Sequence, residues 1–447
     1  MDLDAAEIAQ TARELLKRHW GYDDFRECQL EIITSVLRGY DTLGLLPTGG
    51  GKSITFQIPA LVLDGLTIVV TPLISLMKDQ VDNLRRVGIR ATYLHSGMSM
   101  SEHRLAITRC RLGRVKILYV SPEKLQSRSF LESVTQFNLG LIVVDEAHCI
   151  SQWGYDFRPS YLKIASLRKL FPEVNVLALT ASATSEVVCD IMSQLLFKEL
   201  DHVYARSFHR DNLSYIVRQC DHKDTMLLKV LRGVNGCGIV YVRSRRRTRE
   251  IAQLLCDSGI SASYYHAGLT PEEKDQRQQS WKEGRTRIIV ATNAFGMGID
   301  KPDVRVVVHY DLPSSLEEYY QEAGRAGRDG LPSYAVVLTN ASDKRTLSRR
   351  LTEAFPPKDF ITRVYELAGN FLNVAVGEGY GRTYEFHTDQ FCLTYNLKPV
   401  AVRNALTILS QAGYIEYVDE IASRSRIMML MRRDELYSLN ITELVDK

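Results

Sequence analysis

The sequence lacks any long apolar segment. None of its hydrophobic runs approaches the roughly 18 to 20 residues that a membrane-spanning helix needs. The N-terminal stretch MDLDAAEIAQTARELLKRHW is acidic at its start and predicts an amphipathic helix, without the basic and then apolar pattern of a signal peptide. We therefore expect a cytoplasmic protein that has no membrane partner.

Closely spaced cysteines and a strong charge of one sign are also missing. No two of the eight cysteines form a C-x-x-C pair, so neither a disulfide framework nor a paired-cysteine zinc site is indicated. The 56 Lys and Arg residues nearly balance the 53 Asp and Glu residues, giving a net charge of +3. A strongly basic nucleic-acid-binding chain is excluded, and any contact with DNA or RNA must come from local patches.

Short apolar runs recur between helical patterns. Nine of them, beginning at residues 41, 66, 115, 139, 176, 238, 287, 304 and 334, are rich in Val and Ile and continuous rather than alternating. This pattern is typical of strands that are covered on both faces in a parallel sheet. Because 447 residues exceed what one compact core usually holds, we predict an α/β protein with more than one domain.

An internal repeat indicates two copies of one fold. GIRATYLHSGMS from Gly88 and GISASYYHAGLT from Gly259 match at six of twelve positions, and each ends in His-x-Gly. The break between the copies falls near residues 206–212. We therefore predict two parallel-sheet domains, at residues 1–206 and 207–341.

Residues 342–447 differ in pattern, because the strand rhythm stops and charged helical segments take over. A Gly-rich stretch is followed by a short helix, a turn between Asn396 and Pro399, a longer helix that Gly413 ends, and a β-like segment. We predict a small, mainly helical region that resembles a winged helix. A helical packing domain without DNA contact explains the same pattern equally well.

The stretch LPTGGGKS at residues 46–53 indicates a phosphate-binding loop between a strand and a helix. Such loops usually carry glycine at the position of Leu46, but the later glycines permit the tight backbone. Lys52 would reach the β- and γ-phosphates, and Ser53 would ligate magnesium. A Gly-rich loop without a ligand is the alternative. The residues assigned to the phosphates are Thr48, Gly49, Gly50, Gly51, Lys52 and Ser53.

The stretch LGLIVVDEAH supplies the second half of such a site. An apolar strand carries Asp145 to its carboxyl edge, where ligands of open α/β sheets bind. Asp145 would hold the magnesium ion, and Glu146 would orient or deprotonate the attacking water. Because neighbouring residues on a strand point to different sides, two separate roles are natural. A surface loop is the alternative for DEAH standing alone.

Two arginines lie in the Gly-rich segment YYQEAGRAGRDG of the second copy. A guanidinium held close to the γ-phosphate stabilises the charge that develops there during hydrolysis. We predict this role for Arg325 and Arg328, which would make hydrolysis depend on closure of the two domains. A solvated basic turn is the alternative reading of the same residues.

The order of these stretches with GYDDFRECQ, TPLISLMKDQ, CISQWGYDFRP, LTASAT and VATNAFGMGIDKPDVR resembles the RecQ-family DNA helicases of superfamily 2, over roughly Leu16 to Leu331. The resemblance implies two tandem RecA-like domains and a phosphate loop that does not require glycine at Leu46. It also implies an ATP- and Mg²⁺-dependent enzyme that moves 3′ to 5′ along single-stranded DNA and separates forked duplexes in DNA repair and recombination. We expect a monomer, nucleoid-associated if bacterial.

The resemblance also assigns residues that the spacing alone does not. Tyr22, Arg26 and Gln29 match positions that contact adenine, and Asp300 matches one near the ribose. An aromatic-rich loop matches the family's sensor of single-stranded DNA, and aromatic faces stack on any base with about 1–3 kcal/mol each. The residues assigned to DNA binding or coupling are His148, Trp153, Phe157, Arg158, Thr180 and Thr292.

Departures from the family concern the end of the chain and one basic run. Only Cys392 follows Arg328, so the family's four-cysteine zinc module is not expected. The run from Arg243 to Arg249 could grip a DNA backbone or be a solvated helix start. The chain ends at Lys447, before the further nucleic-acid-binding domain of many relatives, which leaves a trimmed chain and a short family member both open.

Two other functions remain compatible with these stretches. An RNA-remodelling ATPase shares the two domains and most motifs, and its 2′-hydroxyl recognition would distinguish it. A regulatory protein that uses ATP only to clamp DNA would hydrolyse ATP without separating strands.

Overall fold

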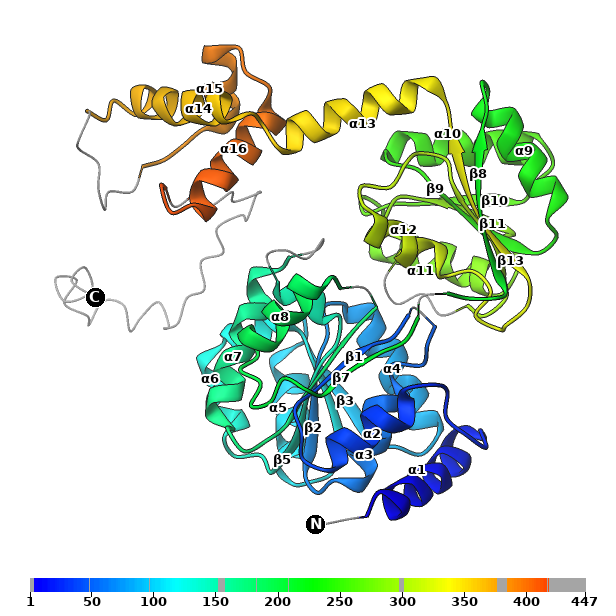
Figure 1. The fold of residues 1–447 in the computed structure, drawn as a ribbon, viewed down its shortest axis with the longest axis vertical. Coiled ribbons are helices and arrows are strands. Elements are labelled where there is room, and N and C mark those ends of the chain that lie inside the picture. Colours follow the sequence, from blue (N-terminus) through cyan, green and yellow to red (C-terminus); the bar gives the residue numbers. More distant parts are fainter. Residues whose placement is uncertain are drawn as a thin grey trace, which may run out of the picture. The chain divides into compact units, whose positions relative to one another are not determined.

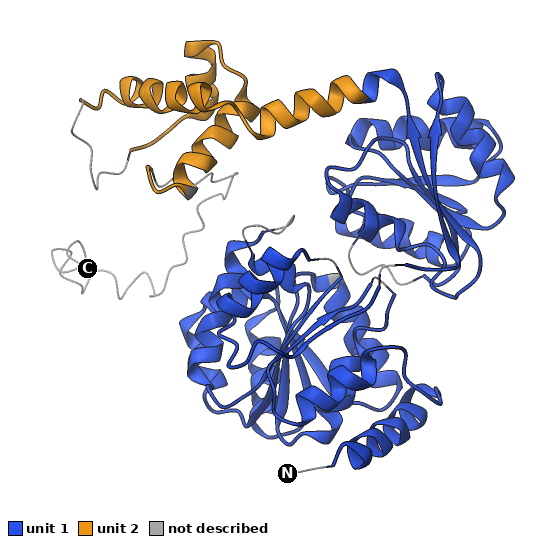
Figure 2. Ribbon diagram, in the orientation of Figure 1, with its two compact units in different colours: residues 1–343 blue, residues 344–447 orange. Residues whose placement is uncertain are grey.

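The computed structural model describes residues 4–47, 49–95, 97–151, 157–181, 183–207, 209–296, 301–375, 384–415 and 417. It divides into two compact units, residues 1–343 and 344–447 (Figure 2). The larger unit contains two parallel sheets, and the smaller one is helical (Figure 1). Among the described residues, no helix is both long and apolar enough to cross a membrane.

The first sheet has seven parallel strands in the order β3-β4-β2-β5-β6-β1-β7, and we call the part around it lobe 1. Its strands are β1 (Thr42–Leu45), β2 (Leu66–Val70), β3 (Ala91–Leu94), β4 (Ile117–Val120), β5 (Leu139–Val144), β6 (Val176–Thr180) and β7 (Val203–Ala205). The central strands β5 and β6 lie beside β2 and β1, so the strand ends that follow these four meet at one edge of the sheet.

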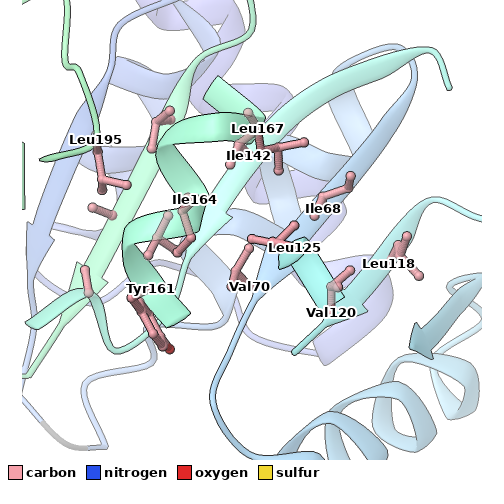
Figure 3. Packing of buried hydrophobic residues seen from close by; sticks show 14 of the residues in the cluster. Ile68, Val70, Leu118, Val120, Leu125, Ile142, Tyr161, Ile164, Leu167 and Leu195 are labelled. Atoms are coloured by element: carbon pink, nitrogen blue, oxygen red, sulfur yellow. The ribbon is translucent and has the colours of Figure 1, made fainter. Parts of the chain in front are cut away.

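Helices cover both faces of the first sheet. They are α1 (Ala5–Trp20), α2 (Gln29–Leu37), α3 (Ile54–Val62), α4 (Ile74–Arg86), α5 (Met100–Arg111), α6 (Arg128–Val134), α7 (Ile164–Leu170) and α8 (Ser185–Gln194), with short 3₁₀ turns at Pro122–Gln126, Ala147–Ile150 and Pro159–Lys163. Ile68 and Val70 of β2 belong to the core cluster that includes α5 to α8 (Figure 3). Val69 between them belongs to the cluster on the other face, with α2 to α4. Burial on both faces explains why the strand sequences are continuously apolar.

The predicted N-terminal amphipathic helix is confirmed as α1. It buries Ile8, Ala12 and Leu16 against α2 and α3, where Ile33 and Ile58 complete the cluster. The helix ends at Gly21, whose φ of 75° is in the left-handed region that glycine adopts easily.

The second sheet has six parallel strands in the order β10-β11-β9-β12-β13-β8, and we call the part around it lobe 2. The strands are β8 (Leu213–Gln219), β9 (Cys237–Tyr241), β10 (Ala262–Tyr265), β11 (Ile288–Ala291), β12 (Val304–His309) and β13 (Ser333–Thr339). The helices are α9 (Lys223–Gly233), α10 (Arg245–Asp257), α11 (Pro271–Lys282) and α12 (Leu316–Ala323). Helices α9 and α10 cover one face, and α11 and α12 contribute to the core on the other.

The internal repeat has the same structure in both lobes. Each copy forms an edge strand, β3 or β10, then the His-x-Gly turn, and then the start of a helix. Ser99 and Thr270 end the two copies as N-caps, and each forms a capping box with Glu102 or Glu273. The prediction of two copies of one parallel-sheet fold is therefore confirmed.

The smaller unit is helical, as predicted. Helix α13 (Ala341–Ala354) spans the unit boundary, and α14 (Lys358–Phe371), α15 (Thr388–Tyr395) and α16 (Pro399–Gln411) follow. Phe391, Val402 and Leu406 form the centre of its core. Asn396 takes φ 50° at the predicted turn before Pro399. The winged-helix identity stays a prediction, because most of the chain after Gly413 lies outside the described residues.

Candidate active site

Two glycines of the predicted phosphate loop have backbone conformations that would be strained for other residues. Gly49 and Gly51 have φ of 80° and 76°, in the left-handed region. A Cβ atom on Gly51 would lie 2.3 Å from Nε2 of Gln29, so a side chain there also has no space. The loop follows β1 and leads into α3, with Lys52 and Ser53 in the turn just before the helix. Thr48 lies outside the described residues.

Two of the three residues predicted to contact adenine donate hydrogen bonds to backbone carbonyls of this loop. Nη1 of Arg26 donates to the Gly49 carbonyl over 2.6 Å, and Nε2 of Gln29 donates to the Gly50 and Gly51 carbonyls over 3.2 and 3.0 Å. The two residues are joined to each other, because the Arg26 amide donates to Oε1 of Gln29. The sequence did not predict this bracing role. Tyr22 is 59% exposed and its predicted contact with adenine stays a prediction.

Lys52 and Glu146 face each other at the carboxyl edge of the first sheet. Nζ of Lys52 lies 3.8 Å from Oε1 of Glu146, and less than a fifth of either side chain is exposed. The structure thus brings the predicted phosphate-binding lysine to the predicted general base.

Asp145 is held by three neighbours. Its Oδ2 accepts from Thr71 over 3.3 Å, its Oδ1 accepts from the Glu146 amide over 3.0 Å, and its carbonyl accepts from the Tyr161 hydroxyl over 3.0 Å. Burial, followed by the charge of Glu146, raises the pKa of Asp145 to about 6. The negative charge of Glu146 disfavours ionisation of Asp145. A divalent cation would stabilise both charges, so the pair fits a site for such an ion.

Thr71 and Tyr161 are contacts that sequence reasoning missed. Thr71 follows β2 directly, and β2 pairs with β5 in parallel, so its place beside Asp145 could have been inferred from the shared sheet edge. Tyr161 is fully buried, and its burial raises its pKa, so the hydroxyl stays a donor. No spacing in the sequence links Tyr161 to Asp145.

We predicted that strand alternation would point Asp145 and Glu146 to different sides. This explanation is wrong. Strand β5 ends at Val144, so both carboxylates lie beyond it. Glu146 instead has φ 48° and ψ 48°, a left-handed conformation that costs a residue other than glycine about 1–3 kcal/mol. Such strain is commonly retained at functional sites, and here it turns Glu146 toward Lys52.

A chain of polar contacts joins Glu146 to the end of β6. Nδ1 of the buried His148 lies 3.5 Å from Oε2 of Glu146 and 2.9 Å from Oγ1 of Thr180. The predicted general base Glu146 therefore lies in contact with His148, which in turn contacts Thr180, and both of these were predicted for DNA binding or coupling. The neighbouring Arg158 donates its backbone amide to the Cys149 carbonyl over 2.9 Å, and Phe157 is partly buried beside it. Trp153 lies outside the described residues.

Lobe 2 contributes two arginines with different surroundings. Arg325 is 3% exposed, and its Nη1 donates to the Gly296 carbonyl inside lobe 2. Arg328 instead lies against the phosphate loop, since a Cβ atom on Gly49 would be 3.1 Å from Cγ of Arg328. Of the two predicted fingers, the structure brings only Arg328 to the loop.

The turn after β11 begins with Thr292, which was predicted to contact DNA. The hydroxyl of Thr292 accepts from the Ala294 amide over 3.4 Å, and its carbonyl accepts from the Phe295 amide. Asp300 lies outside the described residues. Among the residues that are described, no group of three or more His, Cys, Asp and Glu side chains gathers in the way that a metal cage would require.

Comparison with known proteins identifies the family. Residues 26–191 match the DEAD/DEAH box helicase model, and residues 222–330 match the helicase conserved C-terminal domain model. The probable ATP-dependent DNA helicase RecS of Bacillus subtilis is 41% identical over 338 residues, which cover 74% of this chain and 67% of that protein. The chain belongs to the RecQ family.

Other RecQ-family members are similar over the same region. The ATP-dependent DNA helicase RecQ of Pasteurella multocida is 43% identical over 354 residues, or 79% of this chain. The matched region is 56% of that protein, so the chain spans little more than half the length of such relatives.

Solved structures confirm the RecA-like fold of the RecQ-family lobes. Mycobacterium smegmatis helicase Lhr, bound to ssDNA and AMP-PNP, has a TM-score of 0.63 at 20% identity and covers 90% of this chain and 56% of its own. S. cerevisiae Dbp5, bound to RNA and ADP BeF3, has a TM-score of 0.60 at 18% identity, covering 77% and 91%. At such identities the likeness concerns the fold alone.

Proposed function

We propose that the protein is an ATP-dependent DNA helicase that moves 3′ to 5′ along single-stranded DNA and unwinds forked duplexes. The observation that carries the proposal is the convergence of Lys52, Glu146 and Arg328 at one Gly-rich loop. These are a phosphate-binding cation, a carboxylate base and a cation from the second lobe, which are the parts that phosphoryl transfer to water needs.

Each group has a defined task in hydrolysis. Lys52 binds the β- and γ-phosphates while the backbone amides after Gly49 surround them. Glu146 orients the attacking water and accepts its proton, helped by the turned backbone that fixes its side chain. Arg328 stabilises the charge that develops on the γ-phosphate. A magnesium ion held by Ser53 and Asp145 would neutralise phosphate charge, and the crowded carboxylates suit it.

Hydrolysis would be coupled to DNA through the contact from Glu146 to His148 and Thr180. The contact begins at the base and ends at β6, next to residues assigned to DNA sensing. A change at the DNA-binding loop would therefore alter the position of Glu146. A role in repair and recombination, a monomeric state and a cytoplasmic location belong to the same proposal.

The first test is DNA-stimulated ATP hydrolysis by the wild type and by the Lys52→Ala variant. We expect the variant to lose hydrolysis while it stays folded, because the phosphates lose their cation. Lys17→Ala on the exposed face of α1 is the matched control and should keep full activity. Persistent DNA-stimulated hydrolysis in Lys52→Ala would overturn the proposal, and stimulation by RNA rather than DNA would replace the substrate.

A further inference from the structure

The segment that carries Arg328 is held by the connector between the two lobes. Nη1 of Arg210 donates to the Gly324 carbonyl over 3.1 Å, and its Nη2 donates to the Gly327 carbonyl. Nδ2 of Asn212 donates to the same Gly327 carbonyl over 2.7 Å and to the Leu331 carbonyl over 3.0 Å. The bonds therefore bracket Arg328 on both sides.

Gly327 makes this close approach possible. Its φ of 63° is in the left-handed region, and a Cβ atom on it would lie 2.5 Å from Nδ2 of Asn212 and 2.8 Å from Oγ of Ser333. A side chain here would displace the Asn212 and Ser333 side chains, and its backbone would be strained. On the far side of the turn, Asp329 accepts two bonds from Nη2 of Arg305. The backbone next to Arg328 thus has little room to shift.

The other end of the connector is bonded to the nucleotide side of lobe 1. The Arg206 amide donates to the carbonyl of Leu45, the last residue of β1 before the phosphate loop, over 2.9 Å. The Arg206 side chain pairs with Glu27 over 3.1 Å, within the stretch that braces the loop. Arg206 and Arg210 are only four positions apart, so one short segment contacts both halves of the proposed site.

We propose that Arg210 and Asn212 are positioning residues that set Arg328 against the phosphate loop and make its position depend on the lobe connector. The inference rests on the proposed function and adds to it how the finger is placed. Neither side chain contacts the nucleotide in this account. Their donors fix two backbone carbonyls, and a displacement of about 1 Å in such a group can reduce a rate by about 100-fold.

The test compares Arg210→Ala and Asn212→Ala with Arg287→Ala. Arg287 is the matched control, because it is a partly buried arginine whose guanidinium, like that of Arg210, donates to backbone carbonyls, here those of Leu231, Val234 and Gly236. We expect the two connector variants to lose about 10- to 100-fold in kcat, with the KM for ATP and the affinity for single-stranded DNA nearly unchanged. Arg287→Ala should change melting temperature but not kcat.

A double-mutant cycle separates positioning from general damage. Arg328→Lys should keep measurable hydrolysis, since it keeps a positive charge. In this background Asn212→Ala should reduce kcat little further, because both changes act on the group at position 328. Arg210→Lys, which keeps one charged donor, should recover part of the loss. Additive effects in the cycle, unchanged kcat in the connector variants, or an equal loss in Arg287→Ala would each overturn the inference.

The failure of this inference is distinguishable from failure of the proposed function. If the wild type shows no DNA-stimulated hydrolysis, the proposed function fails and the positioning role falls with it. If Arg328→Ala inactivates the enzyme while both connector variants keep wild-type kcat, only the positioning role is wrong.

Discussion

The two lobes share a strand order but use the same sheet edge differently. In lobe 1, the helix after β1 is preceded by a Gly-rich loop, and Lys52 stands 3.8 Å from Glu146. In lobe 2, the corresponding helix after β8 begins with Lys223, which is buried and donates to the Tyr310 carbonyl over 2.6 Å and pairs with Asp343 over 2.8 Å. We propose that Lys52 binds a ligand, whereas Lys223 makes contacts within lobe 2.

The strand that delivers the carboxylates shows the same difference. Asp145 follows β5, whereas Tyr310 follows the equivalent strand β12 and donates to Asp224 over 2.7 Å. The next residue, Asp311, accepts from the Arg243 amide over 2.9 Å. In the described part of lobe 2, Tyr310 and Asp311 are thus both engaged in hydrogen bonds within the lobe. In the proposed mechanism, lobe 1 therefore supplies Lys52 and Glu146, and lobe 2 holds Arg328 in place.

The largest expected difference between the lobes is between the effects of replacing each lysine by alanine. Lys52→Ala should reduce kcat for ATP by at least about 100-fold with little change in stability, since it removes a phosphate ligand. Lys223→Ala should instead lower the free energy of unfolding by about 1–3 kcal/mol, because it removes the donor of the Tyr310 carbonyl and the ion-pair partner of Asp343. Steady-state kinetics and denaturant titration of both variants measure the difference. Similar kinetic losses in the two would contradict it.

The two arginines of lobe 2 should also separate. Arg328→Ala should lower kcat by about 10³-fold, as expected for a finger that stabilises transition-state charge. Arg325→Ala should act mainly on stability, because it strips the buried Gly296 carbonyl of its donor. Single-turnover hydrolysis together with thermal melting tests this. A larger kinetic loss in Arg325→Ala would assign the finger to the other arginine.

The smallest expected effect concerns coupling within lobe 1. Thr180→Val keeps the shape of the side chain but removes the oxygen that contacts His148, so DNA stimulation should fall by about 10-fold while basal hydrolysis persists. Thr67→Val, buried in β2, is the matched control and should keep the stimulation. The ratio of rates with and without single-stranded DNA is the measurement. Equal stimulation in both variants would remove Thr180 from the coupling contact.

The central strands and the phosphate loop could be predicted because their signals are local. All nine apolar runs correspond to strands, namely β1, β2, β4, β5, β6, β9, β11, β12 and β13. The four missed strands are β3, β7, β8 and β10, each at an edge of its sheet. Edge strands are covered less completely, and β8 exposes Tyr215 and Val217, so no continuous apolar run marks it.

Apart from that of Thr71, the contacts that complete the site could not be predicted, because they join residues that no spacing relates. The Tyr161 hydroxyl reaches a backbone carbonyl 16 positions away, and Asn212 reaches one 115 positions away. Every residue has a backbone carbonyl that can accept a hydrogen bond. The residue type of the acceptor therefore gives no sign of such a contact in the sequence. The left-handed backbone of Glu146 is likewise invisible, since glutamate shows no preference for it.

The measurement that tests the account most directly is unwinding of a duplex with a 3′ single-stranded tail, run beside ATP hydrolysis, with a 5′-tailed duplex as control. We predict that DNA stimulates ATP hydrolysis and that only the 3′-tailed duplex is separated. Lys52→Ala and Arg328→Ala should lose both activities. Hydrolysis that leaves both duplexes intact would contradict a helicase and favour an ATP-driven clamp on DNA.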